Sequence, residues 1–234
     1  MFDLGTTDFY ISVPSMPRHE FEKYSTRLFD EWDQFVEQTL ALPDYSLALE
    51  VEEGSVKGFG KITVVLGVLY LGIGNYGSFI SGVQTIREQV STAGDFLAKR
   101  AATPFGSNGS EPKVKKHGGS LARLQRLFLK VQRGEMTTEQ AMSEAENFLG
   151  DDAAANPEFM LELEKSLELA PRFHQQQLLP LDERGIDDPL LHKEKERLPR
   201  PSPSGTNLAP PPHFRVEVWR ESKKGLRKIR VVSL

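Results

Sequence analysis

The sequence predicts an α+β fold, in which a small mixed or antiparallel sheet is combined with a long glycine-rich apolar helix and a small helical bundle. Three observations lead to this fold class. Segments near both ends alternate between apolar and polar side chains, which is typical of strands with one buried face. Residues 62–86 form a stretch of 25 residues without a formal charge. Three segments with helical periodicity follow between residues 120 and 171.

The first 55 residues predict a β-α-β unit. Asp8–Pro14 alternates and contains aromatic and β-branched residues, so we expect a strand there. Apolar residues then recur at spacings of three and four from Phe21 to Leu40, which predicts an amphipathic helix that ends before Pro43. Tyr45–Glu53 alternates again and predicts a second strand. We expect its glutamates to face solvent, and an acidic site is the alternative.

The composition excludes several classes of function. The formal net charge is −4, so nucleic-acid binding would need a local basic patch. The absence of cysteine excludes disulfides, thiolate metal sites and a cysteine nucleophile. No basic region followed by an apolar core begins the chain, so we expect no cleaved signal peptide. These features favour a non-enzymatic protein without a cofactor, in the bacterial cytoplasm or at the inner membrane.

The charge-free stretch is expected to lie within one long helix over residues 56–101. A helix of about twenty apolar residues spans a bilayer core, so residues 62–86 are long enough to insert. Small residues recur in this stretch, and rows of them allow two helices to approach closely. We therefore expect self-association, with a helix buried in a soluble oligomer as the alternative. The predicted oligomerisation or pore residues are Gly67, Gly72, Gly74, Asn75, Gly77, Ser78 and Gly82, of which Gly74, Ser78 and Gly82 form a small-xxx-small row.

The same stretch contains a second pattern. Gly72–Gly77 matches GxGxxG, in which glycines admit a pyrophosphate to a helix N-terminus. The rest of a dinucleotide-binding unit is missing, because no second strand ending in an acid follows about twenty residues later. A nucleotide-binding enzyme is therefore only a remote alternative.

The second half of the chain predicts helices between two linkers. Residues 102–119 are rich in Gly, Ser, Pro and Lys, which is typical of a linker. Residues 120–171 predict a bundle of three helices, with a capping box formed by Thr137 and Gln140. Residues 172–212 contain proline clusters and predict a mostly extended linker. This segment contains His174, Asp187, Asp188 and His192. We expect no metal site there, because the spacings of these residues match no ligand motif.

Residues 213–234 predict a basic β-hairpin. Phe214–Arg220 and Leu226–Leu234 alternate on either side of a turn. An isolated hairpin is marginal in water, so we expect it to complete a sheet with the two N-terminal strands. Basic residues beside an aromatic residue suit single-stranded nucleic acid, anionic lipid, or the protection of a sheet edge. The candidate ligand-binding residues are Trp219, Lys223, Lys224, Arg227, Lys228 and Arg230.

The order of these elements resembles that of a known class of proteins. A glutamate-rich strand at Leu49–Ser55, a glycine-spaced apolar helix and a small charged helical region are similar to small membrane effectors of bacterial antiphage systems, such as the Hailong-type channel effector. The resemblance covers about residues 45–101 and carries over no functional residue. It implies a homo-oligomer that perturbs the membrane and is restrained by a short single-stranded DNA.

The predicted function is therefore a membrane-associated, self-associating pore-forming or depolarising effector, gated by a nucleic-acid ligand. Its expected partners are further copies of itself, short single-stranded DNA and anionic lipid. A soluble oligomeric scaffold, whose helical bundle and basic hairpin recruit partners, is the alternative.

Overall fold

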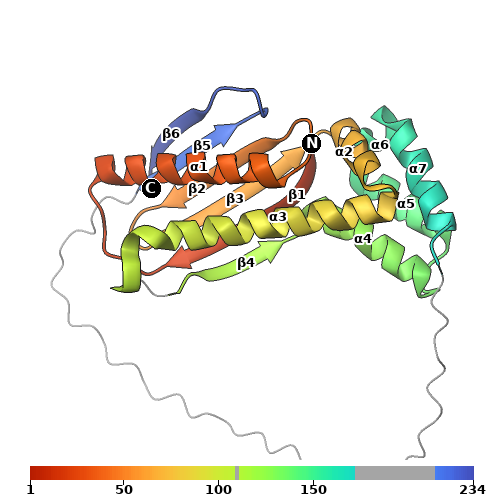
Figure 1. The fold of residues 1–234 in the computed structure, drawn as a ribbon, viewed down its shortest axis with the longest axis horizontal. Coiled ribbons are helices and arrows are strands. Elements are labelled where there is room, and N and C mark those ends of the chain that lie inside the picture. The colour runs from red at the N-terminus through yellow and green to blue at the C-terminus, as the bar shows by residue number, and fades with distance from the viewer. Residues whose placement is uncertain (109–110, 172–213) are drawn as a thin grey trace, which may run out of the picture.

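The computed structural model describes residues 1–108, 111–171 and 214–234, and within these ranges it confirms the α+β fold class (Figure 1). A single antiparallel sheet of six strands has the order β4-β1-β3-β2-β5-β6. The strands are β1 (Phe2–Ile11), β2 (Ser46–Glu52), β3 (Val56–Val64), β4 (Lys113–His117), β5 (Phe214–Arg220) and β6 (Lys228–Ser233). The helices are α1 (Arg18–Thr39), α2 (Leu66–Ile73), α3 (Phe79–Ala102), α4 (Gly119–Gln132), α5 (Thr138–Leu149), α6 (Asp151–Ala155) and α7 (Pro157–Glu168), with 3₁₀ turns η1 (Gly74–Tyr76) and η2 (Thr103–Asn108).

The first four strands have the connectivity of a split βαβ, or ferredoxin-like, unit. The chain runs β1-α1-β2-β3, returns through α2 and α3, and adds β4 beside β1. The C-terminal hairpin then extends this sheet, because β5 pairs with β2. Figure 1 shows α1 and α3 lying across one face of the sheet, with α2 and α4–α7 grouped at one end. This arrangement is shared by proteins with many functions, so it does not itself assign one.

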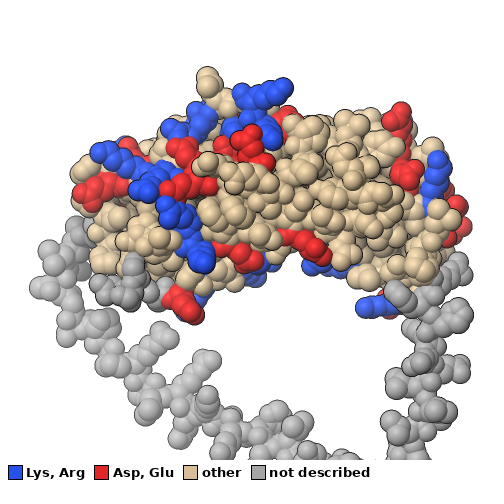
Figure 2. Space-filling view, viewed as in Figure 1, with Lys and Arg blue, Asp and Glu red and all other residues tan. Residues whose placement is uncertain are grey.

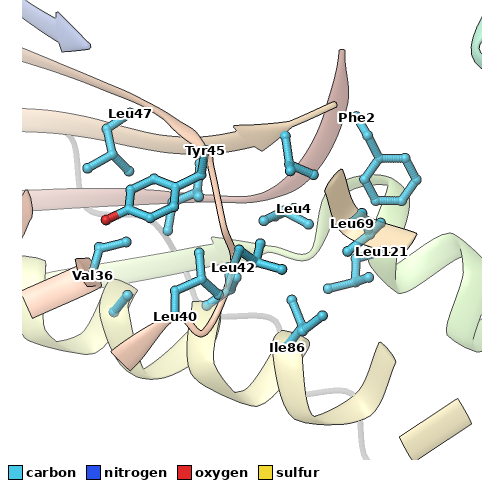
Figure 3. Packing of buried hydrophobic residues seen from close by; sticks show 14 of the residues in the cluster. Phe2, Leu4, Val36, Leu40, Leu42, Tyr45, Leu47, Leu69, Ile86 and Leu121 are labelled. Carbon is cyan, nitrogen blue, oxygen red and sulfur yellow. The ribbon is translucent and has the colours of Figure 1, made fainter. Parts of the chain in front are cut away.

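The core lies between the sheet and the two long helices. Trp32 of α1 is fully buried, and its indole N–H donates a hydrogen bond to the carbonyl of Ala93 in α3 (3.1 Å). Gly60 of β3 permits this packing, since a Cβ there would lie 2.4 Å from the side chain of Leu97. Figure 3 shows Leu42 and Ile86 within this cluster, which continues toward the helical end of the molecule.

The prediction of one helix over residues 56–101 is wrong. Residues 56–64 form strand β3 instead, because a turn at Gly54 and Ser55, both with positive φ, reverses the chain after β2. β3 then pairs with β1 on one side and β2 on the other, which satisfies its backbone hydrogen-bonding groups. The helical part of the segment is also divided, since η1 and Gly77 (φ 78°) separate α2 from α3.

Two predicted boundaries also differ from the structure. The N-terminal strand begins at Phe2 and ends at Ile11, and does not extend over Asp8–Pro14 as predicted. The predicted linker over residues 102–119 contains β4, whose backbone pairs with β1. Lysine-rich segments have low strand propensity, so tertiary pairing decides the structure here.

The bundle and the hairpin are confirmed. Residues 119–168 contain the three expected helices and the short α6 between two of them. Thr137 Oγ1 accepts a hydrogen bond from the N–H of Gln140 (3.3 Å), whose side chain accepts one from the N–H of Thr137 (3.0 Å), so the capping box is present. The hairpin β5–β6 joins the N-terminal strands as expected. The predicted linker over residues 172–212, with its histidines and aspartates, lies outside the described residues.

The structure also bears on the GxGxxG pattern. Gly72–Gly77 covers the last residues of α2, the turn η1 and Gly77, and does not directly follow a strand. All hydrogen-bonded strand pairs within residues 1–108, 111–171 and 214–234 are antiparallel, so β3, the strand before this pattern, has no parallel neighbour such as a dinucleotide-binding βαβ unit requires.

Candidate functional site

The face of the sheet opposite α1 and α3, called here the open face, carries aromatic side chains that the core does not use. Alternation along the strands places Tyr10 of β1, Phe59 of β3 and Trp219 of β5 on this face. All three are half-buried and lie outside the hydrophobic core cluster, whereas Phe9, the neighbour of Tyr10, is buried on the helix-covered face. The open face therefore presents aromatic rings to solvent.

Tyr10 and Phe59 lie close together on the adjacent strands β1 and β3. Tyr10 is directly opposite Lys57 in the β1–β3 register, and Phe59 is opposite Asp8. Tyr10 and Phe59 are thus diagonal cross-strand neighbours. Residues in this relationship are about 7–8 Å apart. Two rings at this spacing, on rigid strands, form a preorganised surface on which flat ligands can stack.

Basic side chains surround these rings. The cations on the open face outnumber the carboxylates seven to five, in a protein whose net charge is −4. The seven cations are Lys57 and Lys61 of β3, Lys113 and Lys115 of β4, Arg215 of β5, and Lys228 and Arg230 of β6. The five carboxylates are Asp3, Asp8, Glu50, Glu52 and Glu217. The open face is therefore locally positive.

The carboxylates of the open face are largely neutralised by neighbours other than the lysines of β3 and β4. Arg215 Nε donates a hydrogen bond to Glu52 Oε1 (3.1 Å), and its Nη1 lies 3.7 Å from Glu50. Arg230 donates to Glu217 (2.6 Å). Among the residues that the structure describes, no carboxylate lies within 4.0 Å of the ammonium groups of Lys57, Lys61, Lys113 and Lys115. These four lysines therefore remain available to an anionic ligand.

A depression of about 410 Å³ lies on this part of the sheet. Its lining combines an aromatic floor with cations from three strands. The residues on the open face that line it are Asp8, Tyr10, Glu50, Glu52, Lys57, Phe59, Lys113, Lys115 and Arg215. The depression is large enough for one or two nucleobases, and its cations suit the phosphates attached to them.

The structure brings together only half of the predicted hairpin residues. Trp219, Lys228 and Arg230 lie on the open face, where Lys228 pairs with Glu221 (2.7 Å). Lys224 lies in the turn.

The remaining two hairpin cations point toward α1. Lys223 Nζ lies 3.5 Å from Glu37, and Arg227 pairs with Asp30. Both partners belong to α1, on the covered side of the sheet. Lys223 and Arg227 therefore help to attach the hairpin to the domain, and their charge is already used.

Sequence reasoning missed the centre of this surface. Tyr10 lies in the predicted N-terminal strand, but Lys57, Phe59 and Lys61 lie where a helix was expected. Their alternation in Lys57-Gly-Phe-Gly-Lys61 is a strand signal that could have revealed a basic and aromatic face. Because the charge-free stretch that follows predicts a helix, the predicted helix was also extended back over residues 56–64.

The predicted small-residue row does not exist as one helix face. Gly74 ends α2, whereas Gly82 lies in α3 beyond the turn at Gly77. Ser78 instead caps α3, since its Oγ accepts a hydrogen bond from the N–H of Ser81 (3.2 Å). The prediction of a continuous Gly74-Ser78-Gly82 row is therefore wrong, because the helix changes direction between its members.

Three of the predicted interface glycines are used inside the protomer. A Cβ at Gly72 would lie 2.1 Å from Leu42, and one at Gly82 would lie 2.8 Å from both the side chain and the carbonyl oxygen of Ile73. A Cβ at Gly67 would lie 2.9 Å from Asn156 Oδ1. Their small size serves packing within one chain. The other predicted residues of this segment, Gly74, Asn75, Gly77 and Ser78, are exposed at the elbow between α2 and α3.

Most large apolar residues of the charge-free stretch belong to the core. Ile62 and Val64 are buried in the sheet, and Leu69, Ile73 and Val83 are buried between helices. No single helix among the described residues has the length and apolar composition to cross a bilayer. Leu66–Tyr76 and Phe79–Phe105 meet those criteria only as a pair, with a bend of 106° between them.

No protein-family model matches the chain, and neither a curated protein nor a solved structure matches it. The described residues contain no group of three His, Asp or Glu side chains placed to hold a metal ion. The assignment of function therefore depends on the geometry of the open face.

Proposed function

We propose that this protein binds short single-stranded nucleic acid on the open face of its sheet and does not itself catalyse a reaction. One observation carries the proposal: Tyr10 and Phe59 lie outside the core on the adjacent strands β1 and β3, beside Lys57 and Lys61, which have no carboxylate partner among the described residues. Stacking on aromatic rings combined with lysine contacts to phosphate is the general mode of single-strand binding. Sheet faces with central aromatic residues bind RNA in this way.

A second explanation of the lysines has to be weighed. Lysines on edge strands prevent sheets from pairing with other chains, and β4 and β6 are the two edges of this sheet. That explanation is sufficient for Lys113, Lys115 and Lys228. It does not apply to Lys57 and Lys61, because β3 is paired on both sides and has no edge to protect.

The carboxylates of the open face favour a particular path for the ligand. Arg215 of β5 is already ion-paired with Glu50 and Glu52 of β2, so this part of the sheet offers no free cation to a phosphate. The lysines of β4 and β3 lie on the two strands next to β1, which carries Tyr10. We therefore expect the phosphates to follow β4 and β3 while bases stack on Tyr10 and Phe59. Bases must be unpaired to reach such rings, which favours a single strand over a duplex.

The proposal is tested by fluorescence anisotropy with labelled deoxyoligonucleotides and oligoribonucleotides of about 10 nucleotides, which lie within the usual range of site sizes. Stacking contributes about 1–3 kcal/mol per base, so Tyr10→Ala and Phe59→Ala should each weaken binding about tenfold or more. Lys57→Gln with Lys61→Gln should weaken binding in low salt.

The matched control is Lys130→Gln with Lys165→Gln, which removes two cations from the helical bundle and should leave the affinity unchanged. Circular dichroism checks that each variant is folded. Wild-type protein that binds no oligonucleotide at low salt, or open-face variants that bind as the wild type does, would overturn the proposal.

A second candidate function is the membrane effector that the order of elements resembles. Val65 and Leu71 support membrane contact, because they lie in the charge-free stretch and expose 53% and 65% of their surfaces. Insertion would also require the buried residues of α2 and α3 to leave the core. Single-stranded DNA bound on the open face would oppose this change, because it binds the folded sheet.

Expression in bacteria with a membrane-potential dye tests this candidate. Depolarisation that Leu71→Glu abolishes would support the effector function. Unchanged potential, together with release of the protein by a carbonate wash, would reject it.

A further inference from the structure

The helix-covered side of the molecule carries a second distinct surface, formed where α1 and α3 lie side by side. One stripe of α3 with helical spacing is uncharged, and so is a facing stripe of α1. The stripe of α3 consists of Thr85, Gln89, Thr92 and Phe96, and the stripe of α1 consists of Gln34, Phe35, Gln38 and the following Ala41. In a chain with 26% charged residues, this concentration of uncharged side chains marks a separate surface.

Two aromatic rings lie at the end of this uncharged groove that is farther from the elbow between α2 and α3. Phe35 and Phe96 stack with their centroids 4.0 Å apart and their planes within 3° of parallel. Both remain half-buried, so the pair is only partly covered by its own protomer. A hollow of about 400 Å³ beside the rings is lined also by Gln34 and Gln38 and, at its rim, by the ion-paired Glu31 and Arg100. Exposed aromatic residues in a charge-depleted patch are typical of the centre of a protein interface.

The uncharged groove continues into the elbow between α2 and α3. Tyr76 of η1 and Gln89 of α3 are hydrogen-bonded to each other (3.0 Å), which joins the two regions. Leu71, Asn75 and Ser78 are exposed beyond this bond. Figure 2, viewed from this side, shows few charged side chains over the middle of the molecule, in contrast to the crowded charges near the start of α1.

The surface is large enough for a weak but specific dimer. Two packed helices, each about 10 Å wide, give the groove a width of about 20 Å. From Phe96 to the elbow the groove extends about 30 Å, at about 1.5 Å per helical residue. It therefore offers about 600 Å² per protomer, and stable interfaces start at about 1,200 Å² in total.

We propose that a second copy of this chain occupies the uncharged groove, in a two-fold symmetric dimer that brings α1 and α3 of both protomers together. An uncharged surface can pair with itself without like-charge repulsion, which most other surfaces of this molecule would cause. The charged rim is also compatible with self-pairing, since Arg100 and Glu31 are bonded within each protomer and so offer both signs of charge.

The dimer would direct the two open faces outward, because each lies on the side of the sheet opposite the helices. Two linked sites raise the effective concentration of the second binding event. This consequence depends on the proposed nucleic-acid function, whereas the dimer itself does not. The two proposals can therefore fail separately.

Mass photometry and sedimentation velocity on the full chain without nucleic acid test the dimer. The wild type should dimerise in the micromolar range. Phe96→Glu and Phe96→Lys should each weaken self-association about 30-fold or more, as expected when a charge replaces an aromatic hot-spot residue.

The control is Leu161→Glu, which changes an exposed leucine of α7 far from the groove and should dimerise as the wild type does. Thermal unfolding confirms that the Phe96 variants are folded. A wild type that stays monomeric at about 100 µM would overturn the proposal. Phe96 variants that form the same dimer as the wild type would also overturn it. Binding to neutral lipid vesicles that Phe96→Glu abolishes, without dimerisation, would assign the groove to a lipid surface and also overturn it.

Discussion

Arg220 at the end of β5 forms an ion pair with Asp33 of α1, although only 9% of the surface of Arg220 is exposed. The guanidinium also lies over the ring of Tyr45, 5.7 Å from its centroid. Burial raises the pKa of the Asp33 carboxyl, and the nearby charge of Arg220 opposes that rise. This pair attaches the C-terminal hairpin to the N-terminal unit, from which it is distant in sequence.

Breaking this pair should destabilise the protein strongly. Asp33→Ala leaves the buried charge of Arg220 without a partner, so we expect a loss of about 3 kcal/mol in the free energy of unfolding. Replacing both residues, Asp33→Leu with Arg220→Met, should recover most of that loss, because no charge is then buried. Urea unfolding measures both. A loss below about 0.5 kcal/mol for Asp33→Ala, the range of ordinary surface substitutions, would show that the pair is not important.

The stability of the protein should fall in acid partly through Glu31. The hydrogen bond from Arg100 lowers the pKa of Glu31 from 4.5 to about 2, against the opposing effect of burial. The unfolded chain therefore binds a proton that the folded chain does not between these values, so stability decreases as pH falls from about 4.5 toward about 2. Above pH 4.5 the contribution is fully present.

Glu31→Gln should lower stability at pH 7 and flatten its decline between pH 4.5 and 2, as measured by urea unfolding at several pH values. Glu22→Gln, in the exposed Arg18–Glu22 pair on the same helix, serves as the control and should change little. Equal acid slopes for wild type and Glu31→Gln would contradict the assignment.

Two glycines of the charge-free stretch should respond differently to alanine. Gly82→Ala places a Cβ 2.8 Å from the carbonyl oxygen of Ile73, so we expect a loss of about 1–3 kcal/mol in stability. Gly74→Ala places a Cβ in open space in a helical conformation, so stability should change by less than about 1 kcal/mol. Thermal or urea unfolding of the two variants compares them. Equal effects would show that packing within the protomer does not explain Gly82.

Nucleic-acid binding should depend on salt through the lysines of β3. For single strands the logarithm of the binding constant falls with the logarithm of salt concentration by about 0.7 per phosphate contact. Lys57→Gln with Lys61→Gln should therefore reduce this slope by about 1.4. Anisotropy titrations between low and moderate salt measure the slope. An unchanged slope with reduced affinity would show that the phosphates do not contact Lys57 and Lys61.

Trp219 should report on ligand binding by fluorescence. The chain contains two tryptophans, of which Trp32 is fully buried and Trp219 is half-buried on the open face. Bases beyond those stacked on Tyr10 and Phe59 can extend across β2 toward β5, so an oligonucleotide of about 10 nucleotides should quench the Trp219 emission. Trp219→Phe should remove the quenching while retaining most of the affinity, because the main contacts lie on β4, β1 and β3. Quenching that persists in Trp219→Phe would show that the signal arises from a change in the core around Trp32.

Local patterns in the sequence were sufficient for those elements whose signals are strong and continuous. The apolar spacing from Phe21 to Leu40 predicted α1, and the pair Thr137 and Gln140 predicted the start of α5. The alternation on both sides of the C-terminal turn predicted the hairpin and its addition to the N-terminal sheet. In each case one period, or one cap, specifies the local structure without help from distant residues.

The sequence by itself therefore determined the fold class, the helical bundle and the hairpin, because these depend on side-chain periodicity within short segments. Only the tertiary structure decided the fate of residues 56–64, which become β3 because β1 and β2 complete its hydrogen bonds on both sides. The same pairing placed Tyr10 beside Phe59 and turned Lys57 toward the open face. That surface is made by strands distant in the chain, and strand register is a relationship between segments that no single segment contains.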